Sequence, residues 1–334
     1  MSNRIFGITT PETFCLYDLT DYRTNEAYKK LDGLERFFVY QLLNFEKDTN
    51  HKWNRYDNGE IVFRNSYLQF AHYNADGVFE GVVTHPDTHC LFLDEIYISL
   101  WDDQVLQHCR KGTRITCDTM NSVCTTLNIA IGCIETEKTA HEEFRKSYPQ
   151  QRKNITMGYL LNRFYDTNGQ LRETLAGNKE LIRFVDVYHT LGNFIPFPNG
   201  CNAARASART KDYWDLTLKY IYDYYHNTEN VHSEPYTDAI CGYGEASYHL
   251  KKWLDEFGNW DTFVEKNYMS AFVNKNEDGT YGEPIELWKG HFSGSVLPKS
   301  LEECNEYFSK ATICILKRGL EMAEKLFEKR KRNQ

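Results

Sequence analysis

The spacing of hydrophobic residues changes along the chain. In residues 26–46, apolar side chains recur at three- and four-residue steps, which predicts an amphipathic helix. From 59 to 100, short β-branched and aromatic runs alternate with Asn-Gly, Asp-Gly and His-Pro-Asp turns, as expected of antiparallel strands. The predicted strands contain residues 61–63, 67–70, 78–83 and 91–93. Residues 96–106 fit either an edge strand or the start of a helix.

Helical spacing dominates after residue 136. A strand that ends in a polar turn is predicted at 115–122, and residues 274–299 have the composition of a loop. The last helix opens with Ser300 and Glu303, which have the spacing of a capping box. The other predicted helices cover residues 138–147, 155–165, 178–190, 214–225, 244–256 and 260–273.

These patterns predict an α+β protein. An N-terminal part, residues 1–135, would contain one helix and an antiparallel sheet. It would pack on a mainly helical part, residues 136–334, with a cleft most naturally placed between them. The alternative is that both parts form a single compact domain.

Composition narrows the class of protein. The 47 acidic and 39 basic residues give a net charge of -8, which disfavours nucleic acid as a partner. No apolar run reaches the length of a membrane span, and the N-terminus lacks the apolar region of a secretory signal. The ten cysteines show no C-x-x-C spacing, so we expect reduced thiols without disulfides in the cytoplasm. Aromatic residues make up 15%, and we expect most of them in the core; the oligomeric state stays open.

The strongest candidate site is the breaker-rich segment 189–215. Arg205 and Arg209 lie four residues apart, so one helical face could present both guanidinium groups to a phosphate or carboxylate. His189 would transfer protons, and the amides would orient the ligand. The polar residues of the segment are His189, Asn193, Asn199, Asn202, Arg205, Arg209, Asp212 and Asp215.

The same segment also has a structural interpretation. Arg205 and Arg209 would pair with Asp212 and Asp215 and so fasten the loop, while the asparagines would cap helices or occupy turns. The residue pattern leaves both interpretations open.

A second candidate is the pair Asp118 and Asn121 at the end of a predicted strand. Their side chains could contact a ligand, with Asp118 as a second proton-transfer group. Alternatively, Asp118 or Ser122 caps a helix that starts near residue 122.

No metal site or cofactor is predicted. His85, Asp87, His89 and Cys90 could ligate zinc, but no second cluster completes the site, so chance clustering in a turn is the better interpretation. The chain also lacks a Walker loop, the G-x-G-x-x-G fingerprint and H-E-x-x-H.

Over about residues 189–225 the chain resembles an uncharacterised family of bacterial proteins. The resemblance implies a bacterial or phage origin and carries no established activity. The matching residues are Gly192, Phe194-Ile-Pro196, Asn202-x-x-Arg205, Asp212-x-x-Asp215-Leu-Thr217-Leu and Tyr224-Tyr225.

Two functional hypotheses follow. In the first, the protein binds or acts on a phosphorylated or otherwise anionic small molecule such as a nucleotide. In the second, it is a non-enzymatic interaction protein of a bacterial defence or mobile-element system, with an exposed aromatic patch. The sequence leaves open whether it is an enzyme.

Overall fold

The structure is a computed structural model, which describes residues 69–73, 79–84, 91–135, 174–175, 177–188, 191–226 and 236–332. The helices predicted at 26–46, 138–147 and 155–165 lie outside these ranges, as does the strand predicted at 61–63.

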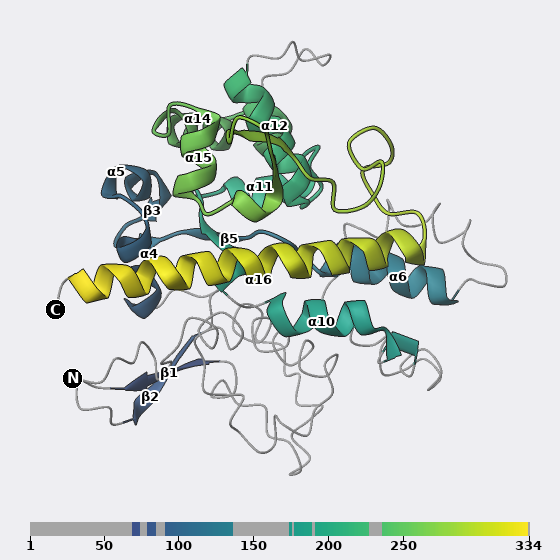
Figure 1. Cartoon of the computed structure of the whole chain (residues 1–334), viewed down its shortest axis with the longest axis horizontal. Coiled ribbons are helices and arrows are strands. Elements are labelled where there is room, and N and C mark those ends of the chain that lie inside the picture. Colours follow the sequence, from purple (N-terminus) through teal and green to yellow (C-terminus); the bar gives the residue numbers. More distant parts are fainter. Residues whose placement is uncertain are drawn as a thin grey trace.

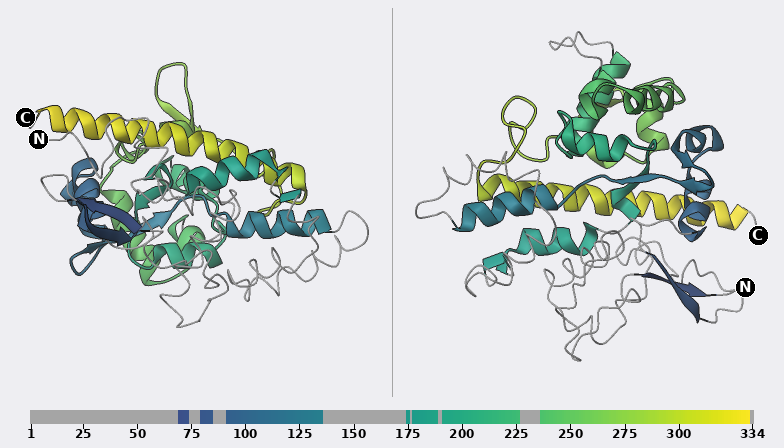
Figure 2. Two further views of the ribbon diagram at one scale, coloured as in Figure 1. Left: turned by 90° about the horizontal axis from the view of Figure 1, so that it is seen from below. Right: turned by 180° about the vertical axis from the view of Figure 1, so that it is seen from behind.

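Helices make up most of the described chain. The α-helices are α4 (Leu91–Leu100), α5 (Asp103–Leu106), α6 (Cys124–Glu135), α10 (Lys179–Tyr188), α11 (Cys201–Ser207), α12 (Trp214–His226), α13 (Tyr236–Cys241), α14 (Glu245–Asp255), α15 (Trp260–Lys266) and α16 (Leu301–Arg332). Helix α16 runs along the middle of the molecule, with α11 to α15 on one side and α10 on the other (Figure 1). Figure 2 shows the same arrangement from behind. None of the helices in the described ranges has the length and apolar character needed to cross a bilayer.

The strands of the described ranges form short antiparallel pairs. They are β1 (Gln69–Tyr73) with β2 (Phe79–Thr84), β3 (Arg110–Lys111) with β4 (Arg114–Ile115), β5 (Cys117–Thr119) with β6 (Phe194–Pro196), and β7 (Val273–Lys275) with β8 (Tyr281–Pro284). Three 3₁₀ turns, η4 (Gln107–Cys109), η6 (Leu191–Asn193) and η7 (Ser270–Phe272), connect them to the helices. The α+β class is therefore confirmed, with a helical C-terminal part. The β5–β6 pair joins residues on either side of the boundary predicted near residue 135, and the division into parts stays a prediction.

The strand predicted at 91–93 is wrong, because these residues open helix α4. Three consecutive apolar residues show no period. The helical spacing is visible only when the buried residues Ile96, Tyr97 and Leu100 are included. The ambiguous segment 96–106 is likewise helical, in α4 and α5.

Two further boundaries differ from the predicted ones. The helix predicted at 260–273 ends at Lys266, since Tyr268 adopts a left-handed φ of 59° that a helix cannot contain. The expected loop 274–299 contains part of the β7–β8 hairpin. The first half of the capping box at the start of α16 is confirmed, since Ser300 Oγ accepts from the Glu303 N–H at 3.2 Å. The Glu303 carboxylate accepts from the N–H of Lys299, one residue before the expected Ser300.

Two clusters of buried apolar side chains form the core. The larger one surrounds Trp214 and Trp253 and joins α4, α12, α14 and α15. The second packs α6 and α10 against α16, around Phe184 and Tyr307. Every tryptophan in the described ranges is buried, so the aromatic excess serves mainly the core, as expected.

Helix α16 is fastened to the segment before β6 by a buried arginine. The Arg318 guanidinium donates to the carbonyl oxygens of Gly192 at 2.8 Å and Phe194 at 2.9 Å, and to that of Asn267 at 3.1 Å. Gly192 lies directly against α16: an added Cβ would overlap the carbonyl oxygen of Ile315 and come within 3.0 Å of the Gly319 nitrogen. This close approach requires glycine at position 192.

We expect Gly192→Ala to lower the free energy of unfolding by about 1–3 kcal/mol, because the methyl group would push η6 away from the α16 backbone. Urea denaturation monitored by circular dichroism measures this change. Gly177→Ala is the matched control, since an added Cβ there meets nothing within 4 Å. Equal stability of the two variants would contradict the close packing at Gly192.

Candidate functional site

Arg205 is the centre of a buried cluster of charges. Its Nε donates to Asp118 Oδ2 at 2.9 Å, and its Nη2 donates to Asp212 Oδ1 at 2.8 Å. The remaining nitrogen, Nη1, lies 3.5 Å from Thr217 Oγ1, and Nη2 also reaches the Thr119 carbonyl oxygen at 3.3 Å. The arginine side chain is 0% exposed, so the protein satisfies this guanidinium from within.

Three separate elements build the cluster. Asp118 lies in β5, opposite Ile195 of β6, and Arg205 comes from α11. Asp212 precedes α12 with a left-handed φ of 72°, a strained conformation for a residue other than glycine. The fold thus brings together three residues that the sequence singled out. Their pairing matches the structural interpretation, with Asp118 where Asp215 was expected.

The environment of Asp118 favours its neutral form. Burial raises the pKa of this carboxyl to about 6, and the negative charge of Asp212 adds to the increase, while Arg205 opposes it. Trp214 Nε1 also donates to Asp118 Oδ2, at 3.2 Å. Asp118 therefore serves Arg205 and Trp214, whereas the helix it was expected to cap, α6, begins only at Cys124.

Asp215 takes part in a second buried pair. Its Oδ2 lies 2.6 Å from His291 Nδ1 and accepts from the Leu287 N–H at 2.9 Å. Trp288 stacks on the imidazole with ring centroids 3.4 Å apart. Both side chains are buried, and His291 Nε2 has no hydrogen-bond partner among the described residues. No sequence motif pointed to His291.

Asn121 and Asn193 bind each other. Asn193 Oδ1 accepts from the Asn121 backbone N–H at 2.9 Å and from its side-chain amide at 3.0 Å. Asn193 Nδ2 donates to the carbonyl oxygens of Tyr188 at 2.9 Å and Asn121 at 3.2 Å. Both asparagines are fully buried, and they join η6 to the end of β5.

The other residues singled out from the sequence lie apart. Asn202 is exposed, and its Oδ1 accepts from the adjacent Ala203 N–H. Arg209 is half-buried, and its backbone N–H donates to the Ala239 carbonyl oxygen. His189 lies outside the described residues, as do residues 85–90, which were considered for zinc. No group of three or more metal-ligating side chains occurs in the part of the chain that the structure describes.

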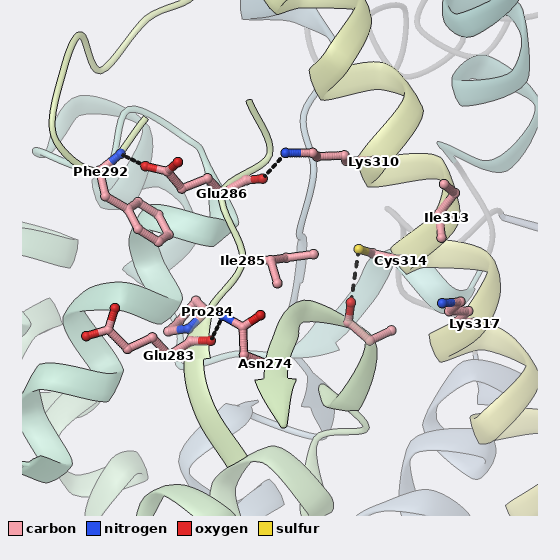
Figure 3. A pocket seen from close by; sticks show the side chains of 11 residues that line it. Asn274, Glu283, Pro284, Ile285, Glu286, Phe292, Lys310, Ile313, Cys314 and Lys317 are labelled. Carbon is pink, nitrogen blue, oxygen red and sulfur yellow. Dashed lines mark hydrogen bonds between the residues drawn. The ribbon is translucent and has the colours of Figure 1, made fainter. Parts of the chain in front are cut away.

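An open pocket of about 640 Å³ lies between α16 and residues 271–292 (Figure 3). Ile285 and Phe292 contribute apolar surface on one wall, and Ile313 does so on the helix. The helix wall also carries Lys310 and Lys317, seven residues apart and so near the same face of α16. None of the residues that the sequence singled out lines this pocket.

The two lysines differ in their partners. Lys310 Nζ lies 2.8 Å from Glu306 Oε1 and donates to the Glu286 carbonyl oxygen at 2.9 Å. Lys317 is exposed and makes no ion pair with any residue that the structure describes. On the facing wall, Glu283 lies 3.4 Å from Lys219. Only the seven-residue spacing of the two lysines on the last predicted helix could have indicated this wall from the sequence.

The loop that forms the facing wall is held by two carboxylates. Glu286 accepts from the N–H groups of Gly290 at 2.9 Å and Phe292 at 2.8 Å. Asp215 holds the same loop from its other side through Leu287 and His291. Side chains of the protein itself therefore hold this wall of the pocket.

The chain belongs to the family of unknown function DUF6994, whose model matches residues 125–322. This range includes Arg205 and Asp212, the Asp215–His291 pair and the pocket, whereas Asp118 lies before it. The comparison confirms membership of an uncharacterised family, while the motif given for residues 189–225 stays a prediction. No curated protein and no solved structure matches the chain.

The Asp118 carboxyl predicts an unusual contribution to the pH dependence of stability. Because its pKa is raised from 3.8 to about 6 in the folded state, the folded protein binds this proton more tightly than the unfolded chain. The contribution is fully present below pH 4 and is lost as the pH rises through 6. The free energy of unfolding of the wild type minus that of Asp118→Asn should therefore fall by about 3 kcal/mol in total between pH 3 and 7, most of it between pH 4 and 6.

Urea titrations at half-unit pH intervals measure this difference. Asp278→Asn is the control with the opposite sign, because hydrogen bonds from Thr280 lower the pKa of the Asp278 carboxyl. If the free energy of unfolding of the wild type instead rises relative to that of Asp118→Asn from pH 4 to 6, the prediction is wrong. The Arg205 charge then outweighs burial in setting the pKa of Asp118.

Proposed function

We propose that the protein binds a small molecule with an anionic group and an apolar body in the pocket beside α16. The observation that carries the proposal is Lys317, a cation on the pocket wall without an ion-pair partner among the described residues. A phosphate or carboxylate of the ligand would pair with its ammonium group. The apolar body would contact Ile285 and Phe292 on the facing wall.

The size and rigidity of the pocket support this proposal. A volume of about 640 Å³ lies within the range of about 300–1,000 Å³ that is typical of small-molecule sites. Glu286 and Asp215 fix the facing wall, so a ligand would not have to order it. In this proposal Asp215 is a positioning residue that does not touch the ligand.

The anionic ligand expected from the sequence is thus assigned to a different place. Arg205 already binds two carboxylates, and a ligand there would have to displace Asp118 or Asp212 from a buried guanidinium. Removing a partner from such a pair is costly, which favours Lys317 as the ligand-binding cation.

The alternative of an interaction protein receives less support. It requires an exposed aromatic patch, but among the described aromatic side chains only Tyr243 and Tyr248 are strongly exposed. We also propose a reducing compartment, the cytoplasm, for which free thiols such as those of Cys109, Cys304 and Cys314 are suited.

Differential scanning fluorimetry tests the proposal. A panel of inorganic phosphate, adenosine monophosphate, hexose phosphates and aromatic and aliphatic carboxylates is compared with uncharged counterparts. We expect at least one anion to raise the melting temperature in a saturable way. Calorimetric titration of that compound into Lys317→Gln should show about tenfold weaker binding, because a charge-assisted hydrogen bond is lost.

Lys275→Gln is the matched control, since it removes the same charge from an exposed position outside the pocket. Its affinity should equal that of the wild type. If no anion shifts the melting temperature, or if both variants bind like the wild type, the proposal is wrong.

A further inference from the structure

Four thiols from separate elements meet in the larger core cluster. They are Cys109 at the end of η4, Cys117 in β5, Cys201 at the start of α11 and Cys241 at the end of α13. Cys109 is close enough to Cys117 and Cys201 for their charges to act on it. The site is independent of the pocket proposed above.

Cys201 and Cys241 are neighbours within this group. The Cys241 thiol donates to the Cys201 carbonyl oxygen, with its Sγ 3.8 Å from that oxygen. Cys201 Sγ lies 3.2 Å from the Ala246 carbonyl oxygen. Helices α11 and α13 pack against each other, so the fold itself holds the two thiols together.

Burial makes both thiols slow to react with solutes. Hydrogen bonding to Cys201 and burial raise the pKa of the Cys241 thiol, so that it is protonated near neutral pH. Cys201 is fully buried, whereas Cys241 retains an exposure of 5%. A small, uncharged oxidant would therefore meet Cys241 first.

We propose that Cys201 and Cys241 form a redox modification site, which a hydroperoxide converts into a disulfide. The Cys241 sulfur attacks the peroxide O–O bond, which gives a sulfenic acid and releases water or an alcohol. The Cys201 sulfur then attacks the sulfenic sulfur, the S–S bond forms and a water leaves. The two thiols lose two electrons, which reduce the peroxide, and their protons end in the products.

The disulfide would join α11 to α13 and close a loop that contains Arg205. It would constrain the unfolded chain, so the oxidised protein should melt at a higher temperature than the reduced one. A thiol reductant should reverse this increase.

The test treats the full chain with hydrogen peroxide, blocks the remaining thiols with iodoacetamide and maps peptides without reduction. We expect a peptide that links Cys201 to Cys241 and is lighter than its parts by two hydrogens. A rise in melting temperature should accompany it, and dithiothreitol should abolish both. Cys241→Ser should lose the linked peptide, whereas Cys314→Ser should keep it, since Cys314 Sγ lies 3.1 Å from the Ala271 carbonyl oxygen.

The wild-type peptide map decides the question even if Cys241→Ser fails to fold. The proposal is overturned if every thiol of the oxidised, folded protein remains open to alkylation after unfolding. It is also overturned if the linked peptide joins Cys109 to Cys117, or if the Cys201–Cys241 link forms only in urea.

Discussion

The contact between Arg318 and the carbonyl groups before β6 is the constraint on which the rest of the described structure depends. A fully buried guanidinium is costly, and burial lowers the pKa of Arg318 to about 10. Backbone carbonyls offset this cost, but only if residues 191–194 stay against α16. Gly192 permits that approach, and any side chain there would separate the two segments.

The position of β6 determines the arrangement of the charges beyond it. Because β6 pairs with β5, the position of residues 194–196 determines that of Asp118. Arg205 of α11 then reaches the Asp118 carboxylate. Asp212 completes that cluster immediately before α12, and Asp215 in the first turn of the same helix binds the loop at His291. Two carboxylates only three residues apart thus act in different places. Asp212 belongs to the Arg205 cluster, and Asp215 holds the pocket wall.

Local patterns predicted the elements, and long-range contacts defined the site. The apolar stripes of α12 and α16 extend over several turns, so their period alone identified them, whereas the triplet 91–93 was too short to show one. Asp212 and Asp215 are the acidic residues expected from the sequence to pair with the arginines, and Asp212 is one of the partners of Arg205. The other, Asp118, is 87 residues away and is brought close by a strand pair that no local spacing encodes.

The chemistry of the pocket was missed for a related reason. Lys317 differs from other surface lysines only because it lies on the wall of a pocket. His291 is distinguished only by its contact with Asp215. Neither property exists until the chain has folded. Residue type and spacing indicate which charged and polar side chains the chain carries. The folded structure decides which of these side chains are already paired with other residues.

At the loop 286–292, the groups that hold the backbone are different from the side chains that line the pocket. Charged residues hold its backbone, with Glu286 binding Gly290 and Phe292, and Asp215 binding Leu287. The apolar side chains of Phe292 and of Ile285, which directly precedes the loop, line the pocket and take no part in these hydrogen bonds. The two side chains can therefore be exchanged for others, which reshapes the pocket surface while the contacts that hold the loop stay the same.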